Sequence, residues 1–141
     1  EIPLRLVGSE MCIRDSHYVW LRKYLADYVE NPDDFTPPRE WVYLMEEYYP
    51  GLKTLEERLA AHNIASESAA LGFMEFALDR LPEKMKKTID KISKDEFFHV
   101  TFGKTLLKKY CVTEEEQQRA YDATVEAMRI MREAREVFVN I

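Results

Sequence analysis

Residues 92–110 read ISKDEFFHVTFGKTLLKKY. A subset of these residues, which includes Glu96 and His99, is spaced with the period of an α-helix and forms one stripe along it. Such a stripe faces the interior of a helical protein. An ionised carboxylate is unfavourable in a dry interior unless another charge compensates it. Glu96 and His99 therefore indicate a metal site, because helical bundles hold transition metals with Glu-x-x-His. The full stripe steps by four and three residues in alternation through Met85, Ile89, Ile92, Glu96, His99, Gly103, Leu106 and Tyr110.

A second carboxylate, Glu67, takes a core position on the helix that we expect over residues 52–81. Its neighbours are small, so that another helix or a liganded ion could come close. Neither Glu67 nor Glu96 has a basic partner on its own stripe, and a bound ion is the simplest source of compensating charge. The alternatives are a salt bridge for each carboxylate and an ordinary core role for His99. The stripe on this helix contains Ala60, Ile64, Glu67, Leu71, Met74, Leu78 and Leu81.

The other segments are predicted to be helical as well. A helix from His17 should end before Pro32, because the residue before a proline disfavours the helical conformation. A short helix over residues 38–49 would have Thr36 as its N-cap. A capping box over residues 113–116 should open the last helix, which extends to about residue 139. The expected inward residues are His17, Leu21, Tyr24 and Tyr28, then Trp41, Leu44, Met45 and Tyr48, and finally Ala120, Thr124, Ala127, Met131 and Ala134.

The composition limits the classes of function. A chain of 141 residues that is 46% hydrophobic and 33% charged suits one folded domain. Its net charge of −6 and the lack of a basic patch argue against a nucleic-acid partner. Its apolar runs fall short of the roughly 20 residues that span a bilayer. The two cysteines show no pairing pattern, which fits a reducing compartment, and we expect a cytoplasmic protein.

With Glu67, Glu96 and His99 in view, the chain resembles the second half of a ferritin-like carboxylate-bridged dimetal protein. Residues 91–110 are similar to the last ligand helix of aldehyde-deformylating oxygenases and of the ribonucleotide reductase small subunit, which also show Asp-Glu-x-x-His followed by Phe-Gly. The step of 29 residues from Glu67 to Glu96 matches the deformylating oxygenases. The resemblance implies an all-α, ferritin-like up-down four-helix bundle whose first helix is missing or replaced, with an extra C-terminal helix.

The resemblance also implies a ligand set. Glu67 would be the ligand of the third helix, Glu96 and His99 those of the fourth, and His17 the histidine of the second. Asp95 would either orient an imidazole ligand or be a solvated neighbour, and we expect His62 to be a surface group. The implied cofactor is two Fe ions, or an Fe/Mn pair.

The implied activity is that of an oxidoreductase that activates O2 to oxidise a small apolar organic substrate. The apolar residues that we expect to line the site are Leu71, Met74, Phe98 and Phe102. An electron-donor protein and a second copy of the chain could be partners.

Residues 6–16, LVGSEMCIRDS, resemble a translated sequencing-library adapter. We therefore expect residues 1–16 to be an artefactual segment and residues 17–141 to be a bundle domain truncated at its N-terminus; a genuine extension is the alternative. Arg14 stands where the second-helix motif has Glu, so four of the six ligands remain. The chain as given is then expected to be inactive and unable to hold both ions, which Arg14 would repel.

Two other classes of function remain open. A ferroxidase or iron-handling protein would use the same ligands, and iron storage would require assembly into a cage. A metal-free helical interaction module would pair its inward charges with Lys or Arg. The separation of the side-chain heads of Glu67, Glu96, His99 and His17 distinguishes a metal site from a metal-free module, because the ligands of a dimetal site should converge within about 8 Å.

Overall fold

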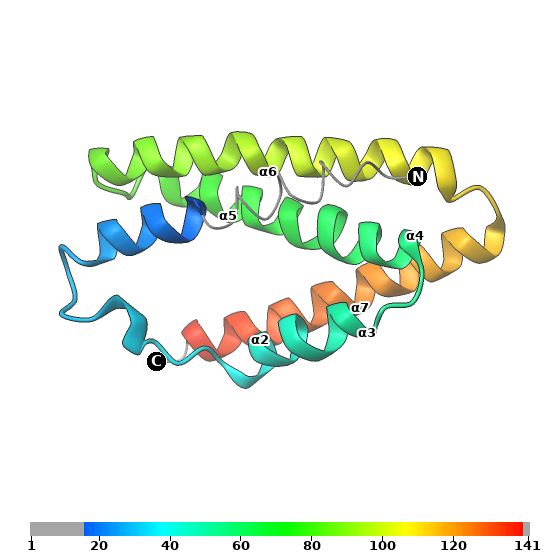
Figure 1. Cartoon of the computed structure of the whole chain (residues 1–141), viewed down its shortest axis with the longest axis horizontal. Coiled ribbons are helices and arrows are strands. Elements are labelled where there is room, and N and C mark those ends of the chain that lie inside the picture. The colour runs from blue at the N-terminus through cyan, green and yellow to red at the C-terminus, as the bar shows by residue number, and fades with distance from the viewer. Residues whose placement is uncertain (1–15, 140–141) are drawn as a thin grey trace.

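The computed structural model describes residues 16–139, and the regular secondary structure of this part of the chain is entirely helical. The prediction of an all-α protein is confirmed. Arg14 and the rest of the suspected artefact, apart from Ser16, lie outside the described residues. In chain order the elements are a helix over residues 16–25, η1 (Pro32–Asp34), α2 (Arg39–Tyr43), η2 (Leu44–Tyr48), α3 (Tyr49–Gly51), α4 (Leu55–Arg58), η3 (Leu59–Ser66), α5 (Glu67–Leu78), α6 (Glu83–Tyr110) and α7 (Glu114–Val139) (Figure 1).

One continuous helix forms the middle of the protein, because α4, η3 and α5 follow one another without a break over residues 55–78. The sequence predicted this helix over residues 52–81. It begins at a capping box, in which the Thr54 backbone N–H donates to Glu57 Oε2 at 2.8 Å. Its central segment, η3, is π-helical. A π-helix closes its hydrogen bonds over five residues rather than four, which changes the side chains that share a face.

A second continuous helix covers residues 39–51, where α2, η2 and α3 join. The N-cap prediction for Thr36 is wrong. The helix begins at Arg39 after Pro38, whose side chain can form no capping hydrogen bond. A proline preceded by another proline keeps residues 36–38 extended and delays the start of the helix.

The helix over residues 16–25 runs antiparallel to α6 (Figure 1). His17 Nε2 lies 2.9 Å from Asp95 Oδ2, and Lys91 Nζ lies 5.0 Å from the centre of the Trp20 ring. Asp27, just after this helix, pairs with Lys84. Rising residue numbers on one segment thus meet falling numbers on the other. This arrangement brings His17 to the middle of α6.

The last helix, α7, packs against η3, α4 and α2. Figure 1 shows α6 on one side of the continuous helix over residues 55–78 and α7 on the other. The predicted capping box at the start of α7 is present, since the Thr113 backbone N–H donates to Glu116 Oε2 at 2.8 Å and the Glu116 N–H donates to Thr113 Oγ1 at 3.2 Å. An apolar cluster fills the interior beside α7 and consists of Leu52, Ala61, Ala65, Ala123 and Ala127.

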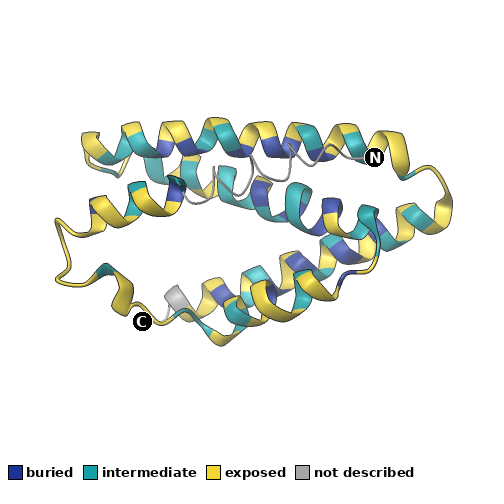
Figure 2. Ribbon diagram, viewed as in Figure 1, coloured by how far each residue is buried: buried dark blue, intermediate teal, exposed yellow. Residues whose placement is uncertain are grey.

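Most of the predicted inward residues are buried or half-buried (Figure 2). The exceptions are Tyr28, Trp41, Met45 and Tyr110, each of which is exposed. Met45 lies in η2, whose π-helical geometry departs from the 3.6-residue period that the prediction assumed, and Trp41 lies in α2, three residues before η2 begins. Tyr28 follows the end of its helix, and Tyr110 is the last residue of α6.

Gly103 sets the separation of α6 and η3. A Cβ atom at this position would lie 2.5 Å from Asn63 Cβ, a separation that real Cβ atoms do not adopt. The Asn63 side chain instead donates from Nδ2 to the His99 backbone carbonyl at 3.4 Å. The space beside Gly103 that the sequence suggested for another side chain or a substrate is thus filled by Asn63.

None of the described helices is both long and apolar enough to cross a membrane.

Candidate metal centre

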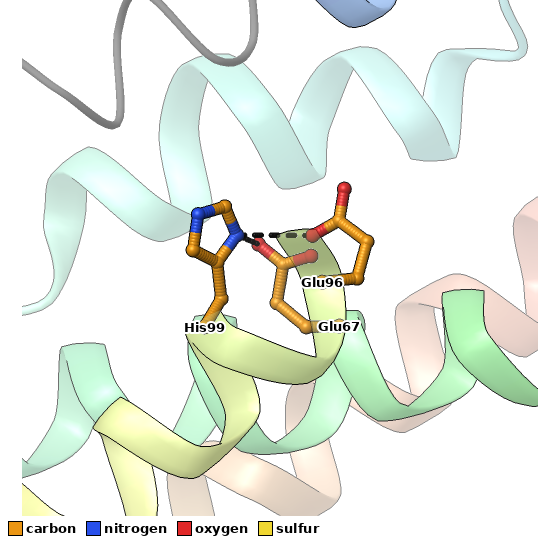
Figure 3. Close-up of side chains that lie close together, drawn as sticks. All are labelled: Glu67, Glu96 and His99. Atoms are coloured by element: carbon orange, nitrogen blue, oxygen red, sulfur yellow. Dashed lines mark hydrogen bonds and ion pairs between the residues drawn. The ribbon is translucent and has the colours of Figure 1, made fainter. Parts of the chain in front are cut away.

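Glu67, Glu96 and His99 converge in the interior beside α5 and α6, and Figure 3 shows the imidazole directed at both carboxylates. One potential ligand atom from each residue lies within 4.8 Å of the other two. His99 Nδ1 is 3.0 Å from Glu96 Oε2 and 3.8 Å from Glu67 Oε1. All three residues are buried, with exposed fractions of 8% for Glu67, 8% for Glu96 and 2% for His99. This group could hold a metal ion.

Local structure explains the convergence. Glu96 and His99 are three residues apart on α6, and side chains at this spacing lie on the same face of a helix. Glu67 is the first residue of α5, directly after the π-helical segment η3. The close approach at Gly103 brings η3 and α6 together one turn from His99.

Glu96 contacts two histidines through its two different oxygens. Its Oε2 faces His99, and its Oε1 lies 3.3 Å from His17 Nδ1. The other ring nitrogen of His17, Nε2, forms a hydrogen bond with Asp95. Asp95 therefore contacts an imidazole, as one of the two alternatives predicted from the sequence required. If Nε2–H donates to Asp95, a neutral His17 turns its Nδ1 lone pair toward Glu96. A second proton or a bound cation is then needed to make the contact attractive.

His62 also belongs to this region, and the prediction that it is a surface group is wrong. Its Nδ1 lies 3.3 Å from Glu67 Oε1, and its side chain is 23% exposed. The two residues are five apart, a spacing that places side chains on different faces of an α-helix. They meet because the intervening segment is π-helical. The sequence pattern, evaluated with a 3.6-residue period, carried no signal for this contact.

The ionisation of Glu96 follows from its neighbours. Burial alone would raise the pKa of this carboxyl group, because a dry environment disfavours its charged form. The hydrogen bonds with His99 and Glu67 and the charge of the nearby imidazoles outweigh burial, and they lower the pKa of Glu96 to about 2. Glu96 is therefore a carboxylate at neutral pH, the form in which it can bind a cation.

The apolar lining that the sequence suggested is only partly observed. Leu71, Met74 and Phe102 are half-buried. Phe98 lies on the outer side of α6 with an exposed fraction of 55%, so its expected role as a lining residue is wrong. Phe98 neighbours His99 in sequence, and adjacent residues of a helix point in directions about 100° apart.

No known protein family, curated protein or solved structure matches this chain. The fold and the site therefore define its class on their own. The chain is a helical protein with a buried carboxylate–imidazole group that could hold a metal ion.

Proposed function

We propose that Glu67, Glu96 and His99 form the metal centre of an oxidoreductase that binds Fe or Mn and activates O2 to oxidise a small apolar organic substrate. The observation that carries the proposal is the convergence of three buried ionisable side chains within 4.8 Å. Carboxylate and imidazole ligands suit these metals. The ferritin-like arrangement suggested by the sequence belongs to the same proposal.

The charges of the group favour a cation. Two carboxylates that approach one imidazole in a buried site repel each other unless they share a proton or a cation, and their removal from water is costly. The described ion pairs of Glu67 and Glu96 are formed with imidazoles, which can also act as metal ligands. A divalent cation would compensate both carboxylates at once.

Glu96 is placed to serve two ion positions, because each of its oxygens faces a different histidine. The first position would take Glu67, Glu96 and His99 as ligands. The second would take Glu96 and His17, with Asp95 holding the far nitrogen of the His17 ring. Since the second position has fewer described donors, we expect it to bind an ion more weakly.

A bound Fe or Mn ion would supply redox and Lewis-acid chemistry at this place. The chain contributes the charge and the geometry. Glu67 and Glu96 provide anionic oxygens, His99 directs Nδ1 at both of them, and Asp95 fixes the orientation of His17. The burial of the three converging residues limits the access of water to the centre.

The proposal is tested by anaerobic titration with Fe(II) or Mn(II), measurement of the metal retained after desalting, and measurement of O2 uptake. We expect the wild-type chain to retain metal and Glu67→Gln to lose at least about tenfold in affinity, because one anionic ligand becomes neutral. Glu75→Gln is the matched control, since Glu75 is exposed on the same helix. Equal metal retention in wild type and Glu67→Gln would contradict the proposed centre.

The same measurements distinguish the two alternative functions, an iron-handling protein and a metal-free helical module. Uptake of O2 together with oxidation of Fe(II) far beyond the number of sites would indicate iron handling, and light scattering would then reveal a cage. A chain that retains no metal, with a thermal stability unchanged by metal or chelator, would be a metal-free helical module.

A further inference from the structure

We infer that His62 is a positioning residue for the metal centre, which holds the Glu67 carboxylate in the orientation that an ion requires. This inference rests on the proposed function. Its central observation is that Glu67 Oε1 lies near two imidazoles, 3.3 Å from His62 Nδ1 and 3.8 Å from His99 Nδ1. His99, in α6, is one of the three converging donors. His62 lies on the same continuous helix as Glu67, over residues 55–78.

The π-helical segment η3 makes this contact possible. In an α-helix, residues five apart point about 140° away from each other. In a π-helix, hydrogen bonds join residues five apart, so that such residues lie nearly one above the other. Because η3 ends at Ser66, His62 is aligned with Glu67 at the start of α5. The unusual helix thus brings a third histidine to the site.

The His62 ring also contacts Tyr49. The two ring centres are 5.2 Å apart at an angle of 65°, an edge-on contact. The Tyr49 hydroxyl group also forms a hydrogen bond with Ser66, whose hydroxyl donates to the Ala61 backbone carbonyl at 3.1 Å. These contacts connect the helix over residues 39–51 to η3 and limit the rotation of the imidazole.

The three histidines of the chain all lie in one row of alternating imidazoles and carboxylates. His62 stands at the end of this row, next to Glu67, and is not among the three residues whose ligand atoms converge within 4.8 Å. Its role is therefore to orient a ligand rather than to bind the ion. The members of the row, in order, are His62, Glu67, His99, Glu96, His17 and Asp95.

A ligand that loses the outer group that orients it typically binds metal about 10–100-fold more weakly. We therefore expect His62→Leu to weaken Mn(II) binding by about 10–100-fold, measured by electron paramagnetic resonance of the free ion, and to alter the visible spectrum of bound Co(II). Ser68→Leu is the matched control, because it places the same side chain on the exposed side of α5 next to Glu67. It should change neither quantity.

Two amide variants separate positioning from a merely structural role. The amide nitrogen of His62→Asn takes the place of Nδ1 and can still donate to Glu67, whereas that of His62→Gln takes the place of Nε2. We expect His62→Asn to restore most of the Mn(II) affinity and the Co(II) spectrum, and His62→Gln to resemble His62→Leu. This comparison also decides the question if His62→Leu does not fold.

The outcomes distinguish the inference from the proposed function. If the wild-type chain binds Mn(II) and His62→Leu binds it equally well with an unchanged Co(II) spectrum, His62 has no positioning role and the metal centre stands. Equal affinities of His62→Asn and His62→Gln would also overturn the inference. If the wild-type chain binds neither ion, the proposed function fails, and the role of His62 fails with it.

Discussion

The two sides of η3 are packed in opposite ways. The side that faces α7 meets an apolar cluster built mostly of alanines, in which Ala61 and Ala127 are fully buried. The side that faces α6 lies next to ionisable groups. Glu67, at the start of α5, meets Glu96 and His99 of α6 there. Burial of apolar surface stabilises a fold, whereas burial of charges costs free energy unless a partner compensates it. The comparison suggests that the α7 side supplies stability and the α6 side supplies binding.

The largest expected effect comes from a cavity in the apolar packing of α7. Ile130 in α7 is 1% exposed, and Ile130→Ala should lower the free energy of unfolding by about 2–5 kcal/mol, because buried apolar contacts are lost and a cavity remains. Chemical denaturation measures this change. Val125→Ala is the control, since Val125 is 48% exposed on the same helix. Losses of equal size at both positions would show that the buried face of α7 does not pack more tightly than its exposed face.

The opposite result is expected when the charged group is replaced as a whole. In the metal-free protein, the triple substitution Glu67→Met, Glu96→Met and His99→Leu should leave the free energy of unfolding unchanged or raise it by about 1–4 kcal/mol, because buried charges are replaced by apolar groups of similar volume. Metal binding should be lost. Calorimetry and metal titration measure the two quantities. A large loss of stability would mean that the charged group supports the fold.

A smaller effect is expected on the α6 side, where α6 approaches η3 most closely at Gly103. Gly103→Ala should destabilise the protein by about 1–3 kcal/mol, because its Cβ would meet Asn63 Cβ at 2.5 Å and push α6 away from η3. Metal affinity should fall as well, since Glu96 and His99 move with α6.

Gly72→Ala is the matched control for this substitution. Gly72 also lies in a helix, and a Cβ there meets nothing within 4 Å, so the substitution should stabilise by about 0.5–1 kcal/mol. Equal effects of the two substitutions on stability would show that the close approach of Gly103 to Asn63 does not position α6 against η3.

The sequence predicts which side chains face inward best where the backbone follows the 3.6-residue period of an α-helix. Glu96 and His99 lie on a regular α-helix, so the 3.6-residue pattern predicts their shared inward face. The inward position of Glu67 was predicted too, because the residues after it are α-helical. That these side chains bind metal stays a prediction.

Two of the failures lie where the backbone leaves this period. His62 is in η3 and Met45 is in η2, both of them π-helical, and each residue lies on a different face from the one expected. A π-helical segment depends on tertiary packing, such as the Tyr49 contact with His62, and hydrophobic periodicity does not contain that information.

The smallest expected effect concerns an ion pair at the rim of the α7 side. Arg119 donates from Nε and Nη2 to Glu56 Oε1 at 3.0 and 2.7 Å.

Burial opposes ionisation of Glu56, but a backbone hydrogen bond and Arg119 outweigh it, so the pKa of Glu56 lies below its ordinary value of 4.5. A lowered pKa in the folded state stabilises the protein above the unfolded pKa, and this contribution disappears as the pH falls through the folded pKa. In a double-mutant cycle of Glu56→Gln and Arg119→Met, we expect a coupling energy at pH 7 that is smaller than the effects above and that disappears as the pH falls through the lowered pKa of Glu56. The exposed pair of Asp90 and Lys94 should show still less coupling. If the coupling of Glu56 and Arg119 did not depend on pH, the contact of α4 with α7 would owe its strength to packing alone, as the apolar cluster beside it does.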